Sequence, residues 1–243
     1  MLQKKNLYYL KFLKNGKREL MKKNKIFVAC DANNITKVKD IIKKTQSSKL
    51  KIGYKFGLEF LNSKNGRNFI SKLKNKITFG DYKIMDIPNT CVSAIKAVKD
   101  LKLNYITIHI SSGLEALKAA KKVSGNTKLI GVTILTSLDN KSLKEIGYGQ
   151  EVKKIVLKQA KLANQAKLDA IVCSPKEVNI VRKVFKKEII TPGIRFDSNV
   201  DDQKRTLAPK QAYKNGSDWL VIGRPITKGN IKNNLQNLIN HLK

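Results

Sequence analysis

Short apolar runs recur along the chain, and the gaps between them are mostly long enough for a helix. The eight runs are Ile26–Cys30, Ile52–Tyr54, Ile77–Phe79, Tyr105–Ile110, Leu129–Leu135, Ala170–Cys173, Ile189–Ile190 and Trp219–Ile222. Apolar positions three and four residues apart predict helices over Ala116–Val123, Val152–Ala166 and Val178–Phe185, with a last helix over Ile231–Leu242. Eight strands alternating with helices predict an α/β fold, a (β/α)8 TIM barrel forming a single domain. A doubly wound open sheet is the alternative, but no glycine-rich dinucleotide loop follows the first run.

Nearly every apolar run is followed by a polar residue with useful chemistry. In order these are Asp31, Lys55, Asp81 with Lys83, His109, Thr136, Ser174, Arg195 and Arg224. In a (β/α)8 barrel the catalytic groups gather at the carboxyl ends of the strands. The recurrence therefore supports the barrel and predicts a functional site at that end.

The densest chemistry lies in the segment from Asp81 to Thr90. If the third strand continues through Lys83, then Asp81 and Lys83 point to the same side. Asp86 follows, just before Pro88 ends any regular ladder. Charges in a segment that begins apolar are costly unless they pair, so we interpret this cluster as a general-acid site instead of a solvated strand end.

The last two strands carry a second signal. The segments 191–195 and 222–225 each place a glycine and an arginine just past a strand. Phosphate sites in such barrels use the loops after strands seven and eight, where glycine admits backbone N–H groups and arginine adds a planar pair of donors. The polar stretch that runs on to Gln203 is interpreted as a mobile lid over the ligand, with a plain surface loop as the alternative.

The formal charge of +32 is extreme, but its make-up argues against nucleic-acid binding. The 50 basic residues are nearly all lysines spread over the whole length, and Arg occurs only at positions 18, 67, 182, 195, 205 and 224. Nucleic-acid binders usually cluster their basic residues and use Arg for bidentate phosphate contacts. We interpret the charge as a compositional lysine bias that can still attract anionic substrates.

Other features exclude further classes. The residues Cys30, Cys91 and Cys173 lack metal-type spacing and indicate free thiols in a reducing compartment, the cytoplasm. Two histidines cannot build a histidine-rich metal site, and no apolar run approaches membrane-spanning length. Residues 1–23 form a basic extension outside the barrel domain of residues 24–243. We interpret it as disordered or as a mis-set start, since Met21 offers a second beginning; a membrane-surface helix or targeting segment is the alternative.

Together these residues closely resemble the orotidine 5′-phosphate decarboxylase family, over about residues 25–227. The most specific piece is the Asp-x-Lys-x-x-Asp-Ile-Pro-Asn-Thr segment at 81–90. Seven further fragments agree in order: 28–31, 54–57, 135–137, 173–175, 191–195, 202–205 and 223–226. The chain departs from the common Asp-Leu-Lys-Leu-His-Asp pattern at Tyr82 and Met85, neither of which carries the proton chemistry.

The resemblance implies an enzyme that converts orotidine 5′-monophosphate to UMP and CO2, the last step of de novo pyrimidine nucleotide synthesis. Lys83 would donate the proton to C6, and Lys55, Asp81 and Asp86 would complete a charged network. The implied substrate contacts are Asp31, Lys55 and Thr90 to the ribose, Thr136 to the base edge, and Arg195, Gln203, Gly223 and Arg224 to the 5′-phosphate, with Ile87 as a further substrate-binding residue. The family pattern brings Asp86 and Thr90 from the partner subunit of a homodimer, and it uses no cofactor and no metal.

Three rival interpretations remain. A metal-dependent sugar-phosphate decarboxylase or aldolase would share Asp-x-Lys-x-x-Asp but lack the Ile-Pro-Asn-Thr continuation at 87–90. A nucleic-acid-binding protein without catalysis would account for the charge of +32. A barrel that has lost activity is the third, and the intact Asp81, Lys83 and Asp86 argue against it.

Overall fold

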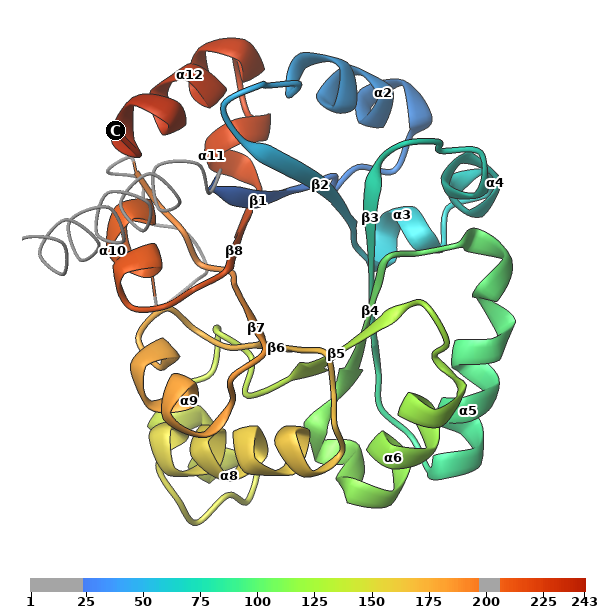
Figure 1. The fold of residues 1–243 in the computed structure, drawn as a ribbon, viewed down its shortest axis with the longest axis vertical. Helices are drawn as coiled ribbons and strands as arrows, with labels where there is room; N and C mark the ends of the chain where they lie inside the picture. Colours follow the sequence, from blue (N-terminus) through green and yellow to red (C-terminus); the bar gives the residue numbers. More distant parts are fainter. Residues whose placement is uncertain (1–23, 197–205) are drawn as a thin grey trace, which may run out of the picture.

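The computed structural model describes residues 24–196 and 206–243, and the predicted extension at 1–23 lies outside the described residues. Eight parallel strands close into a barrel in the order β1 to β8, with helices around the outside (Figure 1). The strands are β1 (Lys25–Ala29), β2 (Lys51–Phe56), β3 (Ile77–Ile84), β4 (Tyr105–His109), β5 (Lys128–Val132), β6 (Ala170–Val172), β7 (Glu188–Thr191) and β8 (Trp219–Ile222). The pairing of β1 with both β2 and β8 closes the ring. The predicted barrel is confirmed, and the open sheet is excluded.

Helices follow the strands in the expected alternation. The α-helices are α2 (Ile35–Lys44), α3 (Leu58–Leu61), α4 (Gly66–Ser71), α5 (Pro88–Ala97), α6 (Gly113–Val123), α7 (Asn140–Glu145), α8 (Val152–Gln165), α9 (Val178–Val184), α10 (Pro209–Lys214), α11 (Arg224–Thr227) and α12 (Ile231–His241). Two 3-10 turns, η1 (Lys99–Leu101) and η2 (Ile110–Ser112), complete the described elements. The periodic helices end within a residue of the prediction, whereas α6 begins three residues earlier because the chain turns at Gly113, which has a φ of 86°.

Strand ends differ from the prediction where the chain turns toward the site. The predicted strand Leu129–Leu135 ends at Val132, although Thr133 still donates its backbone N–H to the Val172 carbonyl at 3.1 Å. Beyond it, Ile134, Leu135 and Thr136 line a cavity instead of extending the ladder. Apolar character marks burial, but it does not distinguish a strand from a buried loop wall.

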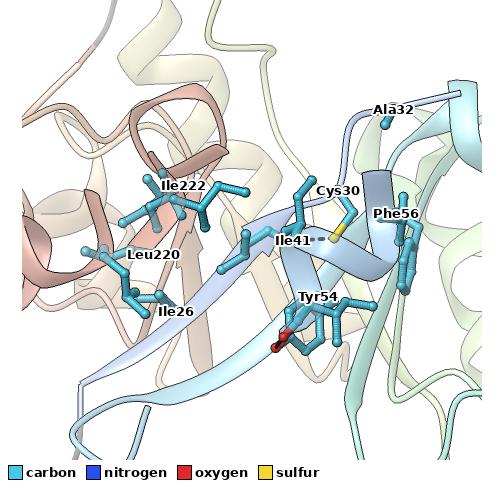
Figure 2. Close-up of a cluster of buried hydrophobic side chains, with 14 of the residues drawn as sticks. Ile26, Cys30, Ala32, Ile41, Tyr54, Phe56, Leu220 and Ile222 are labelled. Carbon is cyan, nitrogen blue, oxygen red and sulfur yellow. Dashed lines mark hydrogen bonds between the residues drawn. The ribbon is translucent and has the colours of Figure 1, made fainter. Parts of the chain in front are cut away.

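Strand alternation divides the core into two parts. On β1, Ile26 and Val28 face the helices, while Phe27 faces the barrel interior. Figure 2 shows the outer part between β1, β2, β8 and α2, where Ile41 lies among Ile26, Tyr54, Leu220 and Ile222. A second outer cluster packs α5, α6, α8 and α9 onto β4–β7.

The inner part is an aromatic plug that fills the lower barrel. The Phe27 ring stacks on Trp219 with a centroid distance of 4.2 Å and meets Phe79 and Tyr105 edge-on at 5.1 and 5.2 Å. At the amino ends of the strands, Glu188 accepts hydrogen bonds from the Tyr105 hydroxyl at 3.0 Å and from Trp219 Nε1 at 3.2 Å. The polar residues that line the cavity come later on the strands, toward the carboxyl ends. The plug therefore forms the floor beneath the site.

Candidate active site

A cavity of about 270 Å³ opens at the carboxyl ends of the strands. Asp31, Lys55, Asp81 and Lys83 line it from β1, β2 and β3 or the residues just beyond them. Because β1 is also paired with β8, the segments after β7 and β8 lie on the other side of β1 and bring Gly193, Arg195, Gly223 and Arg224 to the same cavity. Thr136 lines it from beyond β5.

Four of these side chains form an alternating chain of charges. The Lys55 Nζ lies 3.0 Å from Asp31 Oδ1 and 3.5 Å from Asp81 Oδ2. Asp81 Oδ2 in turn accepts a hydrogen bond from Lys83 Nζ at 2.7 Å. The order carboxylate, ammonium, carboxylate, ammonium gives each inner group two opposite neighbours, which is the arrangement that makes buried charge tolerable.

Burial and pairing act in opposite directions on the two inner groups. The side chains of Lys55 and Asp81 are each 12 % exposed. Burial by itself lowers the pKa of Lys55, but Asp81 and Asp31 outweigh it and hold the pKa above its ordinary value. Burial by itself raises the pKa of Asp81, but Lys55 and Lys83 outweigh it and hold the pKa below its ordinary value. Both groups therefore stay charged at neutral pH.

Lys83 occupies an unusual backbone position. Its φ of 51° lies in the left-handed region, which costs a side-chain-bearing residue about 1–2 kcal/mol. The register between β3 and β4 shifts between Gly80 and Ile84, so the strand bulges at this point. Strain of this kind clusters at functional sites, and here the strained residue is the one whose ammonium donates to Asp81 at 2.7 Å.

Asp86, Ile87 and Thr90 lie apart from this charged chain. Asp86 Oδ1 accepts the backbone N–H of Ile87 at 2.7 Å, and among the ion pairs of the described ranges Asp86 has none with Lys83. Ile87 is 67 % exposed and precedes α5, whose first turn carries the exposed Thr90. In the single chain, these three predicted residues are not among those that line the cavity.

The predicted phosphate residues are brought together, except for one. Arg195 follows Gly193, which has a φ of 73°, and the segment is held by hydrogen bonds of Arg195 N to Leu207 O and Leu207 N to Gly193 O, both 3.1 Å. A side chain on Gly223 would stand 3.4 Å from Ala29 Cβ and 3.8 Å from Asp31 Oδ2, so this glycine lies close beside Asp31. Gln203, with the predicted lid, lies outside the described residues.

Comparison with known proteins shows the family to which the chain belongs. The family model described as "Orotidine 5'-phosphate decarboxylase / HUMPS family" matches residues 24–234. The chain belongs to this family.

Individual relatives agree. An orotidine 5′-phosphate decarboxylase of Wolbachia sp. subsp. Brugia malayi is 42% identical over 223 residues, covering 89% of this chain and 97% of the relative. Another from Wolbachia pipientis subsp. Culex pipiens is 44% identical over 180 residues, covering 72% and 79%. The crystal structure of orotidine 5′-phosphate decarboxylase from Lactobacillus acidophilus superposes with a TM-score of 0.76 at 29% identity, covering 90% of this chain and 99% of that one. The resemblance seen in the sequence and the enzyme class that it implied are confirmed.

Sequence reasoning missed two residues that support this decarboxylase-family site. Thr107 on β4 is fully buried and donates its hydroxyl to Asp81 Oδ1 at 3.2 Å. A Cβ on Gly57 would lie 2.9 Å from Asp31 Oδ1 and 3.4 Å from Lys55 Nζ, so a larger residue would crowd that ion pair. The signal in the sequence was that Thr107 is a polar residue at an inward position of the apolar run 105–110.

His109 lies at the end of β4, near the charged chain. Burial, and then the nearby Lys83, lower the pKa of its imidazole, with Asp81 acting in the opposite direction. The imidazole is therefore neutral at pH 7 and adds no third positive charge beside Lys55 and Lys83.

The described residues contain no group of three or more His, Cys, Asp or Glu side chains placed to hold a metal ion. None of the helices in the described ranges is both long and apolar enough to cross a membrane.

Proposed function

We propose that the chain decarboxylates orotidine 5′-monophosphate to UMP and CO2, with Lys83 as the proton donor to C6. The observation that supports the proposal is the row of alternating charges formed by Asp31, Lys55, Asp81 and Lys83. These side chains line the same cavity as Arg195, Gly223 and Arg224. One part of the cavity suits the reacting base and ribose, and the other suits a phosphate. Family membership supports this substrate.

The chemistry needs a positioned cation. When the bond from C6 to the carboxylate breaks, CO2 leaves and the electron pair stays on C6 as a carbanion with little ring delocalisation. A preorganised ammonium stabilises that charge without reorganisation cost. Lys83 then transfers a proton from Nζ to C6, giving UMP and a neutral amine that water reprotonates. Asp81, 2.7 Å from Nζ, holds the ammonium in place.

The remaining predicted contacts divide between ribose and phosphate. Asp31 and Lys55 would bind ribose hydroxyls, and Thr136 would face the base edge. Arg195, Gln203, Gly223 and Arg224 would hold the 5′-phosphate, remote from C6. Binding energy from such a remote group can be used to assemble the reacting end of the site.

The site is completed, in this proposal, by a second copy of the chain. Asp86 and Thr90 would come from the partner subunit of a homodimer, together with Ile87 beside the substrate. In support, these residues are exposed in one subunit, and Met85 and Ile87 are large apolar side chains that are 60 % and 67 % exposed. Exposed apolar residues next to polar ones are typical of interaction surfaces.

We further propose that the reaction uses neither a metal nor a cofactor, since the ammonium supplies the positive charge. The metal-dependent sugar-phosphate rival makes the opposite prediction, and a chelator separates the two. The family description names a second group beside orotidine 5′-phosphate decarboxylase, so the chelator test is needed.

The test follows the loss of orotidine 5′-monophosphate absorbance with and without a chelator, for the wild type and Lys83→Ala. We expect chelator-insensitive conversion to UMP that is abolished in Lys83→Ala. Lys51→Ala is the matched control, because this exposed lysine lies at the opposite end of β2 from Lys55. No conversion by folded wild-type protein would overturn the function, and loss of activity on chelation would favour the sugar-phosphate rival.

Arg224→Ala tests the division of labour within the cavity. Removing a phosphate contact should mainly raise KM, whereas removing the proton donor should abolish kcat. Comparable losses of kcat in Arg224→Ala and Lys83→Ala would contradict that division.

A further inference from the structure

We propose that the hydroxyl of Thr107 is a positioning group that holds Lys83 and Asp81 in their reacting geometry. The inference rests on the proposed function of Lys83 and concerns how β4 supports that residue. Thr107 is fully buried and does not line the cavity, so it acts through other residues and does not touch substrate.

The register of β3 and β4 shows why a support is needed here. Gly80 pairs with Ile106, and the next pair is Ile84 with Ile108. Residues 81–83 of β3 therefore stand opposite the single residue Thr107. Such a bulge disrupts the ladder and leaves backbone groups without their ordinary strand partners.

One hydroxyl serves both functional residues within that bulge. Thr107 Oγ1 accepts the backbone N–H of Lys83 at 2.8 Å, so the side chain takes the place of a strand carbonyl. The same hydroxyl donates to Asp81 Oδ1 at 3.2 Å, while Asp81 Oδ2 accepts from Lys83 Nζ. Backbone, carboxylate and ammonium thus form a closed loop of hydrogen bonds through Thr107.

The loop restrains two degrees of freedom that the chemistry depends on. The bond to the Lys83 N–H holds a backbone with a φ of 51°, which most side-chain-bearing residues avoid. The bond to Oδ1 fixes the rotation of the Asp81 carboxylate, leaving Oδ2 toward Lys83 and Lys55. The proposed phosphate contacts Arg195 and Arg224 are not part of this loop, so we expect its loss to affect the chemical step more than substrate binding.

The experiment compares Thr107→Val, which keeps the shape and removes the hydroxyl, with Thr107→Ser, which keeps the hydroxyl. We expect kcat to fall by about 10²-fold in Thr107→Val, the size of effect seen when a reacting group is slightly misplaced. KM, and the Kd of UMP measured by calorimetry, should stay within about threefold, and Thr107→Ser should keep kcat within about threefold of wild type.

Thr45→Val is the matched control. Thr45 is also fully buried and its hydroxyl also donates a hydrogen bond, to the Ile41 carbonyl at 2.7 Å at the end of α2. Equal losses of kcat in Thr45→Val and Thr107→Val would indicate a purely structural role and would overturn the inference. A kcat for Thr107→Ser as low as that of Thr107→Val would also overturn it. A kcat for Thr107→Val close to wild type overturns it as well.

Two further outcomes are informative. If Thr107→Val does not fold, Thr107→Ala and Thr107→Ser form the deciding pair, because they differ by the hydroxyl. We expect Ser to exceed Ala in kcat by at least about tenfold, and equal values would overturn the inference. Absence of turnover in folded wild-type protein would overturn the proposed function itself. That result differs from an active wild type whose kcat is unchanged in Thr107→Val, which overturns only the role of Thr107.

Discussion

Asp81 is the residue through which most of the site's charges interact. Its carboxylate lies 2.7 Å from Lys83 Nζ and 3.5 Å from Lys55 Nζ through Oδ2, and it accepts the Thr107 hydroxyl through Oδ1. Removing one partner from a buried group of this kind leaves the others uncompensated. The titration of this one carboxylate should therefore be visible in the stability of the whole protein.

The sign of that effect follows from the lowered pKa of Asp81. Between the folded and the ordinary pKa the unfolded chain binds more protons, so stability rises with pH there. The contribution is complete above the ordinary pKa of an aspartate and is lost as the pH falls through the folded pKa. We expect Asp81→Asn to show a smaller loss of unfolding free energy than wild type as the pH falls from about 6 to about 3.

Urea unfolding at a series of pH values measures this difference. The control is Asp100→Asn, since the Asp100 carboxylate pairs with Arg67 at the surface and is 58 % exposed, where ion pairs contribute little. If the free energy of unfolding depends on pH in the same way for wild type and Asp81→Asn, then Asp81 does not make the predicted contribution to stability.

At the scale of the elements, β1 and β2 pack the barrel floor closely around a glycine. A Cβ on Gly53 would lie 2.6 and 2.7 Å from atoms of the Phe27 ring and 3.2 Å from Ile77 Cγ2. Phe27 is stacked on Trp219 and is fully buried, so it has no room to move away. Packed interiors transmit such strain, here to the layer directly beneath the site.

We therefore expect Gly53→Ala to destabilise the protein by about 1–3 kcal/mol through overpacking. Gly149→Ala is the control, because a Cβ there would meet nothing within 4 Å, and it should change stability by no more than about 0.5 kcal/mol. Urea midpoints compare the two variants. Equal stability of both would mean that the floor can repack around an added methyl group.

At the scale of the whole molecule, the proposal that Asp86 of a partner subunit completes the charged network can be tested. A mixture of two inactive variants, Lys83→Ala and Asp86→Asn, tests this directly. In a mixed dimer, the site that keeps Lys83 would receive the intact Asp86 from the other subunit. Random pairing would then restore about a quarter of wild-type activity.

The mixing experiment has a clear opposite outcome. If Asp86 acted within its own subunit, both sites of every mixed dimer would lack one residue, and no activity would return. Each variant refolded alone serves as the control for residual activity.

The formal charge of +32 gives a prediction of its own. A strongly positive molecule attracts an anionic substrate, and salt screens that attraction. We expect kcat/KM for orotidine 5′-monophosphate to fall several-fold between about 10 and 300 mM salt, with kcat nearly unchanged. Stopped-assay kinetics at several salt concentrations measure this. Salt-sensitive binding to unrelated duplex DNA without any decarboxylation would instead support the nucleic-acid alternative.

The linear sequence was sufficient for the architecture and for most of the site. Apolar runs spaced for helices predicted the barrel, because strands buried on both faces must be apolar and the helices between them amphipathic. Polar residues at strand ends predicted the cavity residues Asp31, Lys55, Asp81, Lys83, Arg195 and Arg224, because a parallel barrel brings all carboxyl ends to one side.

What the tertiary structure decided is the pairing between distant segments. The bulge at Lys83, the hydroxyl of Thr107 behind it and the tight fit of Gly53 on Phe27 each depend on the register of two neighbouring strands. The sequence shows how side chains alternate within each strand, but it does not show the register between neighbouring strands, because that register is set by packing in three dimensions. The same limit explains why Thr107 was overlooked as one polar residue in an apolar run.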